Sequence, residues 1–174
     1  MRRKLLLNRQ GPKRGFDASE MVAFRNIAQY NRAQQMKSDF HRRSVASRFS
    51  AAAPTYDHTA KVQLGVALKL MRFFTDVPNP ARVLEIGCGT GLLTQLLADR
   101  FPGVEIEGID LAKDLVRMAS HRFAGNSNVS LHVADALTYR PGRLSQVIAS
   151  SSTFHWITPL KDLFRTGAGM LKPD

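Results

Sequence analysis

Residues 83–92 read Val-Leu-Glu-Ile-Gly-Cys-Gly-Thr-Gly-Leu. The apolar first half of this stretch predicts a buried strand, and glycines follow at 87, 89 and 91. Glycine adopts positive φ readily and lets a ligand approach the backbone without a Cβ in the way. A dinucleotide fingerprint, G-x-G-x-x-G, would need its last glycine at position 92, which is leucine. The stretch therefore predicts a strand, a ligand-binding turn and a helix, with a tight turn that has no ligand as the alternative.

Strands and helices alternate on the C-terminal side of this turn. Such alternation predicts a parallel, doubly wound sheet with right-handed crossovers. The predicted class is therefore α/β, a Rossmann-like sheet with strands 1–4 only and helices before it. Since residues 172–174 form a turn with no strand behind it, we expect an incomplete fold, a fragment of a longer protein, whose fourth strand is an open edge. The expected strands are 82–86, 104–109, 129–133 and 147–149, and the expected helices are 92–100, 113–123 and 158–171, the last with Thr158 as N-cap and Pro159 as its first residue.

The N-terminal region differs from the rest in charge. Residues 1–50 hold 12 of the 25 Lys and Arg but 3 of the 14 Asp and Glu. A basic arm can bind nucleic acid, an anionic membrane or an acidic protein, and a solvated extension is the plain alternative. The acidic residues of this region argue against an organelle transit peptide, since such peptides are poor in Asp and Glu. We expect residues 1–40 to be a partly disordered or helical basic extension and residues 41–174 to be the globular domain.

Three helices are expected before the first strand. Residues 1–16 are expected to be disordered, and Asp17 to Glu20 form a capping box for a helix that fades near residue 37. A second helix covers 39–51 and ends before Pro54. The apolar face of the first is Met21, Phe24 and Ala28, and that of the third, 57–74, is Ala60, Leu64, Ala67, Leu68, Met71 and Phe74.

Composition excludes several classes. The single cysteine, Cys88, allows no intramolecular disulfide, and no cluster suggests a metal site, so a reducing, cytoplasmic location is expected. No run of 18 apolar residues suggests a membrane span. The 174 residues suit one globular core.

Two acids lie at predicted strand ends. Asp110 closes the second strand, 19 residues after Gly91, where a carboxylate can accept hydrogen bonds from both ribose hydroxyls. Its alternative role is N-cap of the next helix. Asp135 follows the third strand and can accept from an adenine amino group while a neighbouring backbone N–H donates to the ring, with a turn residue as the alternative. Because open α/β sheets bind ligands along this edge, both acids are expected at one cleft.

At these residues the sequence resembles the class I S-adenosylmethionine (SAM)-dependent methyltransferases. Residues 85–91 are similar to the family's first motif, Asp110 to its ribose acid, Asp135-Ala136 to its adenine motif, and 150–156 to the strand end that faces the methyl acceptor. The resemblance covers about 45–174 and implies SAM as cofactor. The cofactor-binding residues it implies are Tyr56, Glu85, Gly87, Gly89, Gly91, Asp110, Leu111, Asp135, Ala136 and Ser151.

A narrower resemblance lies upstream. Residues 45–63 resemble the F-x-x-A-A-x-x-Y-D-x-x-A-x-x-Q entrance helix of the malonyl-acyl-carrier-protein O-methyltransferases of biotin synthesis. This implies that Phe49 and Tyr56 cover the SAM pocket and that the Tyr56 hydroxyl reaches the SAM carboxylate, although Tyr56 can also be a helix-packing residue. Gln63 fits a surface as well as a pocket position. The sequence departs from the family pattern in His155, which replaces a glutamine before Trp156, and in its basic leader.

The implied reaction is methylation of the free carboxylate of a malonyl group on acyl carrier protein. This carboxylate is ionised at pH 7, so no general base is required and no catalytic residue is predicted. His155 and Trp156 are expected near the acceptor, with His155 the candidate base if the acceptor is an amine or hydroxyl. In the family an arginine from later strands binds the acceptor, and no residue here is assigned that role. The alternatives are another small molecule or tRNA as acceptor, and a non-catalytic module that binds SAM or nucleic acid.

Overall fold

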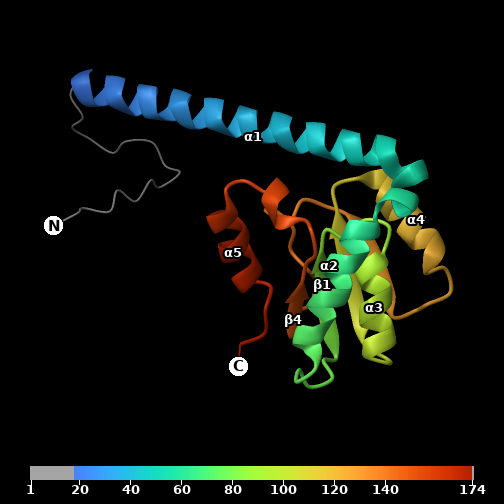
Figure 1. Cartoon of the computed structure of the whole chain (residues 1–174). Coiled ribbons are helices and arrows are strands. Elements are labelled where there is room, and N and C mark those ends of the chain that lie inside the picture. The colour runs from blue at the N-terminus through green and yellow to red at the C-terminus, as the bar shows by residue number, and fades with distance from the viewer. Residues whose placement is uncertain (1–17, 174) are drawn as a thin grey trace. The chain divides into compact units, whose positions relative to one another are not determined.

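The structure is a computed structural model that describes the backbone of residues 18–173. It describes the side chains of residues 25, 28–56 and 60–173. The expected disorder of residues 1–16 and the capping aspartate at 17 lie outside the described residues. The chain divides into two compact units, Met1–Asp39 and Phe40–Asp174, and the second contains the sheet. The elements are α1 (Ala18–Thr59), α2 (Lys61–Met71), the 3-10 helix η1 (Arg72–Phe74), β1 (Arg82–Ile86), α3 (Leu92–Arg100), β2 (Glu105–Asp110), α4 (Lys113–Arg122), β3 (Val129–Val133), β4 (Val147–Ala149), the 3-10 helix η2 (Phe154–Trp156) and α5 (Leu160–Ala168) (Figure 1).

The sheet has four parallel strands in the order β3-β2-β1-β4. β1 is central, and its residues Val83 to Ile86 are all buried, as expected of a strand covered on both faces. The order reverses beside β1, because β2 and β4 lie on its two sides. Ligands of open α/β sheets bind at such a point, beyond the carboxyl ends of the strands. The predicted α/β class is confirmed: the four strands are parallel, and helices follow β1, β2 and β4.

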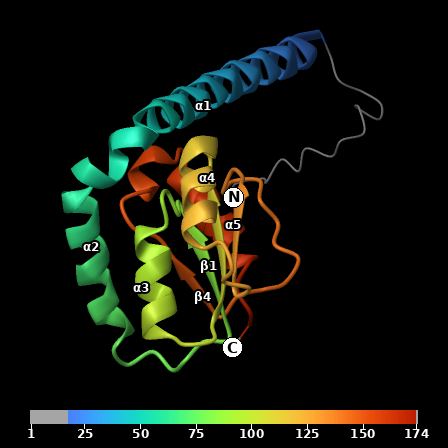
Figure 2. The ribbon, with the colours of Figure 1, turned by 90° about the vertical axis from the view of Figure 1, so that its right-hand side faces the viewer.

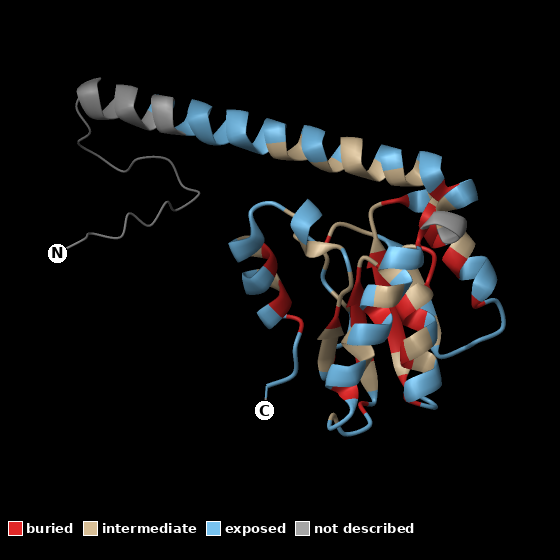
Figure 3. Ribbon diagram, viewed as in Figure 1, coloured by how far each residue is buried: buried red, intermediate tan, exposed pale blue. Residues whose placement is uncertain are grey.

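Alternate residues of the strands build two apolar cores. Val83 and Ile106 pack with Leu97 and Phe101 in the core under α2 and α3. In Figure 2 these two helices lie on the same side of β1 and β4. On the other face, the core formed by α5 contains its residue Leu163. Figure 3 shows the buried residues along the sheet and on the sides of α3 and α5 that face it. Burial of these apolar surfaces is the main term that stabilises the fold.

The N-terminal helices differ from the prediction. The helices expected to end near 37 and before Pro54 form one helix, Ala18–Thr59, with Pro54 inside it. No glycine or proline interrupts residues 37–39, so no local signal stops the helix there. Pro54 lacks the N–H that would bond four residues back, but its neighbour Ala53 is 3% exposed and packs against α4. Tertiary packing therefore overrides the local cost of the proline.

The helix expected over 57–74 is also divided, and its predicted buried face is partly wrong. Ala60, Ala67 and Phe74 are buried as expected, but Leu64 and Leu68 are 38% and 51% exposed. The inward face follows residues 60, 63, 67, 70 and 74, so the leucines lie on its flank. Ala67 of this face packs in the core with Val83 and Leu97. On the predicted N-terminal face, Ala28 is exposed, and the side chains of Met21 and Phe24 lie outside the described set.

The C-terminal helix is shorter than predicted. Pro159 is the N-cap of α5 where Thr158 was expected, and the helix ends at Ala168 instead of Leu171. Residues 170–172 turn back to the sheet: Ser145 N–H donates to the Met170 carbonyl at 2.9 Å, and Lys172 N–H to the Ser145 carbonyl at 2.8 Å. Leu171 thus forms a parallel bridge with Ser145 just before β4. Within residues 18–173, the outer side of β4 itself pairs with no strand.

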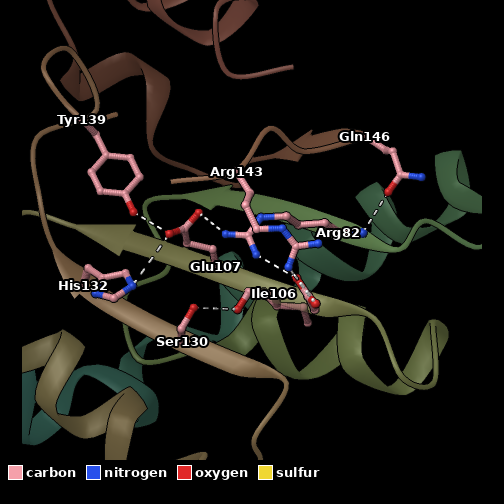
Figure 4. Close-up of polar contacts among 9 residues, drawn as sticks. Arg82, Ile106, Glu107, Ser130, His132, Tyr139, Arg143 and Gln146 are labelled. Atoms are coloured by element: carbon pink, nitrogen blue, oxygen red, sulfur yellow. Dashed lines mark hydrogen bonds and ion pairs between the residues drawn. The ribbon is translucent and has the colours of Figure 1, made fainter. Parts of the chain in front are cut away.

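A cluster of hydrogen-bonded and ion-paired side chains joins the amino-terminal halves of β1 and β2 (Figure 4). The buried carboxylate of Glu107 accepts from Arg82 at 2.7 Å and from the Tyr139 hydroxyl at 2.6 Å. Glu105 accepts from Arg82 at 2.9 Å and from Arg143 at 3.0 Å. These bonds lower the pKa of Glu105, and burial raises the pKa of Tyr139. Each buried charge has an opposite partner, so the cluster is a structural element.

Candidate cofactor-binding site

The glycine turn after β1 is hydrogen-bonded to the end of β2. The N–H groups of Gly87 and Cys88 both donate to the carbonyl of Ile109, at 2.7 and 3.1 Å. Gly87 has φ +79°, and a Cβ there would collide with Thr153 in the loop after β4. Gly89 has φ +54°, and a Cβ there would meet no atom within 4 Å. The first glycine is therefore required by packing, whereas the second keeps space open at the edge of the sheet.

Asp110 joins this turn to the start of α4. Its carboxylate accepts from Gly89 N–H at 3.0 Å and from Ala112 N–H at 2.8 Å. Burial raises its pKa, and the backbone donors offset part of that effect. The N-cap of α4 is Ala112, so the alternative role of Asp110 as N-cap is wrong. The acid instead holds the glycine turn in position through a bond to Gly89.

Asp135 lies just beyond β3 and is bonded on both carboxylate oxygens. One oxygen accepts from Leu137 N–H at 2.9 Å, and the other lies 3.0 Å from Arg42 Nε. Arg42 comes from α1 and was missed by sequence reasoning. The signal that could have found it is heptad spacing: Arg42, Phe49 and Tyr56 are seven residues apart and therefore share one face of the helix.

Glu85 lies beneath the glycine turn and is 1% exposed. Burial raises its pKa to about 8, the hydrogen bond from Thr94 Oγ1 at 2.6 Å lowers it, and the nearby Asp110 charge raises it further. Burial likewise raises the pKa of the Cys88 thiol, which stays protonated at neutral pH. The cleft thus contains a carboxyl group with a raised pKa, and a nearby cation would lower that pKa.

One cleft brings most of the predicted residues together. It measures about 1010 Å³, its solvent-open mouth included. Gly91 does not line it, because this glycine packs against Phe123. His155 is exposed and also lies outside the lining. The predicted residues that do line the cleft are Phe49, Tyr56, Gln63, Glu85, Gly87, Gly89, Asp110, Leu111, Asp135, Ala136, Ser151 and Trp156.

Aromatic side chains from two elements meet at this cleft. The ring of Phe49 in α1 contacts Trp156 of η2 edge-on, with centroids 5.6 Å apart, and Tyr56 at 6.1 Å. η2 itself was not predicted. Two residues that line the cleft, Ser151 and Gln63, each have a buried side-chain oxygen, Oγ and Oε1, with no hydrogen-bond partner within the described part of the chain. Buried polar groups normally have partners, so these two atoms are suited to a polar ligand.

Neither membrane nor metal features are seen in the described chain. No helix among residues 18–173 is long and apolar enough to cross a membrane. Within the same residues, no three His, Cys, Asp or Glu side chains are grouped as metal ligands.

The family follows from a match over more than half of the chain. A family model described as a methyltransferase domain matches residues 83–174. The chain belongs to this methyltransferase family.

Curated relatives are more specific in name. A malonyl-acyl-carrier-protein O-methyltransferase 2 of Ilyobacter polytropus is 33% identical over 132 residues, which are 76% of this chain and 51% of that protein. A malonyl-acyl-carrier-protein O-methyltransferase of Geobacter sulfurreducens is 36% identical over 136 residues, again 76% and 51% of the two chains. The chain spans about half the length of these relatives.

Among solved structures, the chain is similar to SAM-bound CalS10, an amino pentose methyltransferase from Micromonospora echinaspora. The identity is 27% and the TM-score 0.56, over 69% of this chain and 51% of that one. The resemblance to class I methyltransferases read from the sequence is thus confirmed at the level of family and fold.

Proposed function

We propose that the chain binds SAM in this cleft and methylates the free carboxylate of a malonyl group carried by acyl carrier protein. The proposal that the cofactor is SAM is carried by one observation: the glycine turn, Asp110 and Asp135 line the same cleft. The acceptor part is supported by the names of the curated relatives.

The donors and acceptors of the cleft fit an adenosyl ligand. Each carboxylate oxygen can accept two hydrogen bonds, so Asp110 can accept from ribose hydroxyls while it keeps its bonds to Gly89 and Ala112. Asp135 can likewise accept from an amino group beside Leu137 N–H. The open side of Gly89 leaves room for the ligand at the turn. These roles of Asp110 and Asp135 are those that the sequence predicted.

The charge of the cleft fits a cationic ligand. Three lining carboxyl groups, Glu85, Asp110 and Asp135, face one lining arginine, Arg42. SAM carries a sulfonium and an ammonium group. A cation near Glu85 favours its ionised form and offsets the desolvation that raises its pKa. The two unpartnered atoms, Ser151 Oγ and Gln63 Oε1, add polar contacts.

Bound SAM supplies an electrophilic methyl group. The task of the protein is to hold an acceptor oxygen about 3–3.5 Å from that carbon, in line with the breaking bond, and to exclude water. The aromatic contact between Phe49 and Trp156 places apolar surface at the cleft for this purpose. A carboxylate acceptor is already ionised, so the exposed position of His155, away from the cleft lining, is no obstacle.

A methyl-transfer assay tests this proposal. The 174-residue chain is incubated with tritiated-methyl SAM and either malonyl-carrier protein, acetyl-carrier protein, which lacks the free carboxylate, or tRNA. We expect label as a base-labile ester on the malonyl form alone. Label on tRNA would contradict the proposed acceptor, and SAM binding without transfer to any of the three acceptors would indicate a non-catalytic module. An Asp110→Asn variant is the control for a dependence on the cleft.

A further inference from the structure

An arginine outside the predicted motifs lies at the adenine end of the proposed cofactor site. Arg42 Nε is 3.0 Å from Asp135 Oδ2, and the two side chains are only 17% and 20% exposed. Both line the cleft. An ion pair largely removed from water fixes its groups more firmly than a surface pair does, because solvent screens it less.

The pair leaves the carboxylate able to accept a further bond. Asp135 Oδ1 accepts from Leu137 N–H at 2.9 Å, and Oδ2 faces Arg42. Each oxygen retains a second acceptor position. Held from both sides, the carboxylate has one orientation. An acceptor held in one orientation binds a donor more tightly than a mobile one, since less freedom is lost on binding.

We propose that Arg42 is a positioning residue for the base of the cofactor: it holds the Asp135 carboxylate in the orientation that receives the adenine amino group. This inference rests on the proposed SAM site and names a residue that sets affinity at its adenine end. Arg42 acts through Asp135, so its removal weakens ligands that contain adenine and leaves the rest of the site unchanged.

The surrounding packing makes this role separable from holding α1 in place. Ala53 of α1 is buried with Ala112 and Leu115 at the start of α4. Phe49 contacts Trp156, 5.6 Å between centroids. The globular part of α1 therefore keeps its apolar contacts when the Arg42 charge is removed.

The chain supplies a matched control next to the residue. Arg43 is an exposed arginine of the same helix and does not line the cleft. Arg42→Ala and Arg43→Ala are compared with the unchanged chain, and Arg42→Met, which keeps the aliphatic stem, replaces the alanine variant if that does not fold. Binding is measured by calorimetry with three ligands. S-adenosylhomocysteine (SAH) and 5′-methylthioadenosine contain adenine, and S-ribosylhomocysteine lacks it.

We expect Arg42→Ala to weaken SAH and methylthioadenosine by the same factor, on the order of tenfold, and to leave S-ribosylhomocysteine unchanged. In an Asp135→Asn background the same substitution has little further effect, because its route of action is already lost. Arg43→Ala binds all three ligands normally.

Three outcomes overturn the inference. They are normal SAH binding by Arg42→Ala, an equal loss for S-ribosylhomocysteine, and additive losses in the double variant. If the unchanged chain binds no SAH, the proposed function fails and this inference with it. If the unchanged chain binds SAH and Arg42→Ala binds it equally well, only this inference fails.

Discussion

Replacing Glu85 by glutamine should remove a large part of the pH dependence of folding. In the folded chain burial raises the pKa of Glu85 from its ordinary value near 4.5 to about 8. The unfolded chain therefore releases this proton near pH 4.5, whereas the folded chain keeps it up to about pH 8. Between these values the unfolded state binds fewer protons, so the free energy of unfolding falls as the pH rises.

The magnitude follows from the two pKa values. The slope reaches about 1.4 kcal/mol per pH unit for one proton, and from pH 5 to pH 8 the loss is about 3 kcal/mol. Glutamine does not titrate, so Glu85→Gln lacks this contribution. Below pH 5 the protonated acid and glutamine are of similar shape, and the Thr94 hydroxyl can still donate to the side-chain oxygen of either.

Urea unfolding of both chains between pH 5 and 8.5, followed by the fluorescence of the single tryptophan, Trp156, measures the difference. Other groups titrate equally in both chains, so subtracting the two curves isolates Glu85. We expect the variant to gain about 3 kcal/mol relative to the unchanged chain across this range. Parallel curves would contradict this prediction, because they would show that Glu85 titrates at its ordinary pKa in the folded chain.

Three further predictions come from local geometry. Gly89→Ala should cost only about 1–2 kcal/mol of stability but weaken SAH binding at least about tenfold, since its Cβ enters open space at the cleft. Gly87→Ala should prevent stable folding, because its Cβ collides with Thr153 in the loop after β4. Thermal melting measures the stability of both variants, and calorimetry measures SAH binding. Phe74→Ala should destabilise the chain by about 3–5 kcal/mol and Phe73→Ala by less than about 0.5 kcal/mol in urea unfolding, because these neighbours are 7% and 81% exposed. Asp110→Asn should lower both stability and SAH affinity, since an amide NH₂ then faces one of the two backbone N–H donors that the carboxylate satisfies, and equal SAH binding by this variant would contradict the ribose role.

The sequence predicted the sheet well because its signals there are local. The strand 82–86, the glycine turn and the helix that follows are set by consecutive residues, and they form as expected. Asp110 and Asp135 could be assigned to one cleft because parallel strands bring their carboxyl ends to the same edge.

The N-terminal helices were less predictable because tertiary contacts decide them. Pro54 reads as a helix end, yet packing of its neighbour Ala53 against α4 keeps the helix intact. Leu64 reads as core, but it is 38% exposed, and the alanines Ala60 and Ala67 are the buried residues instead. Arg42 could not be paired with Asp135 from sequence, since their contact joins residues 93 positions apart.

The proposed function requires that the cleft at the carboxyl ends of the strands binds SAM. Amide NMR of the isotope-labelled chain during a titration with SAH measures this binding residue by residue. We expect saturable shifts that are largest for Gly89 N–H, bonded to Asp110, and Leu137 N–H, bonded to Asp135. Shifts that do not saturate, or that centre on the far end of the sheet around Arg82, would contradict it.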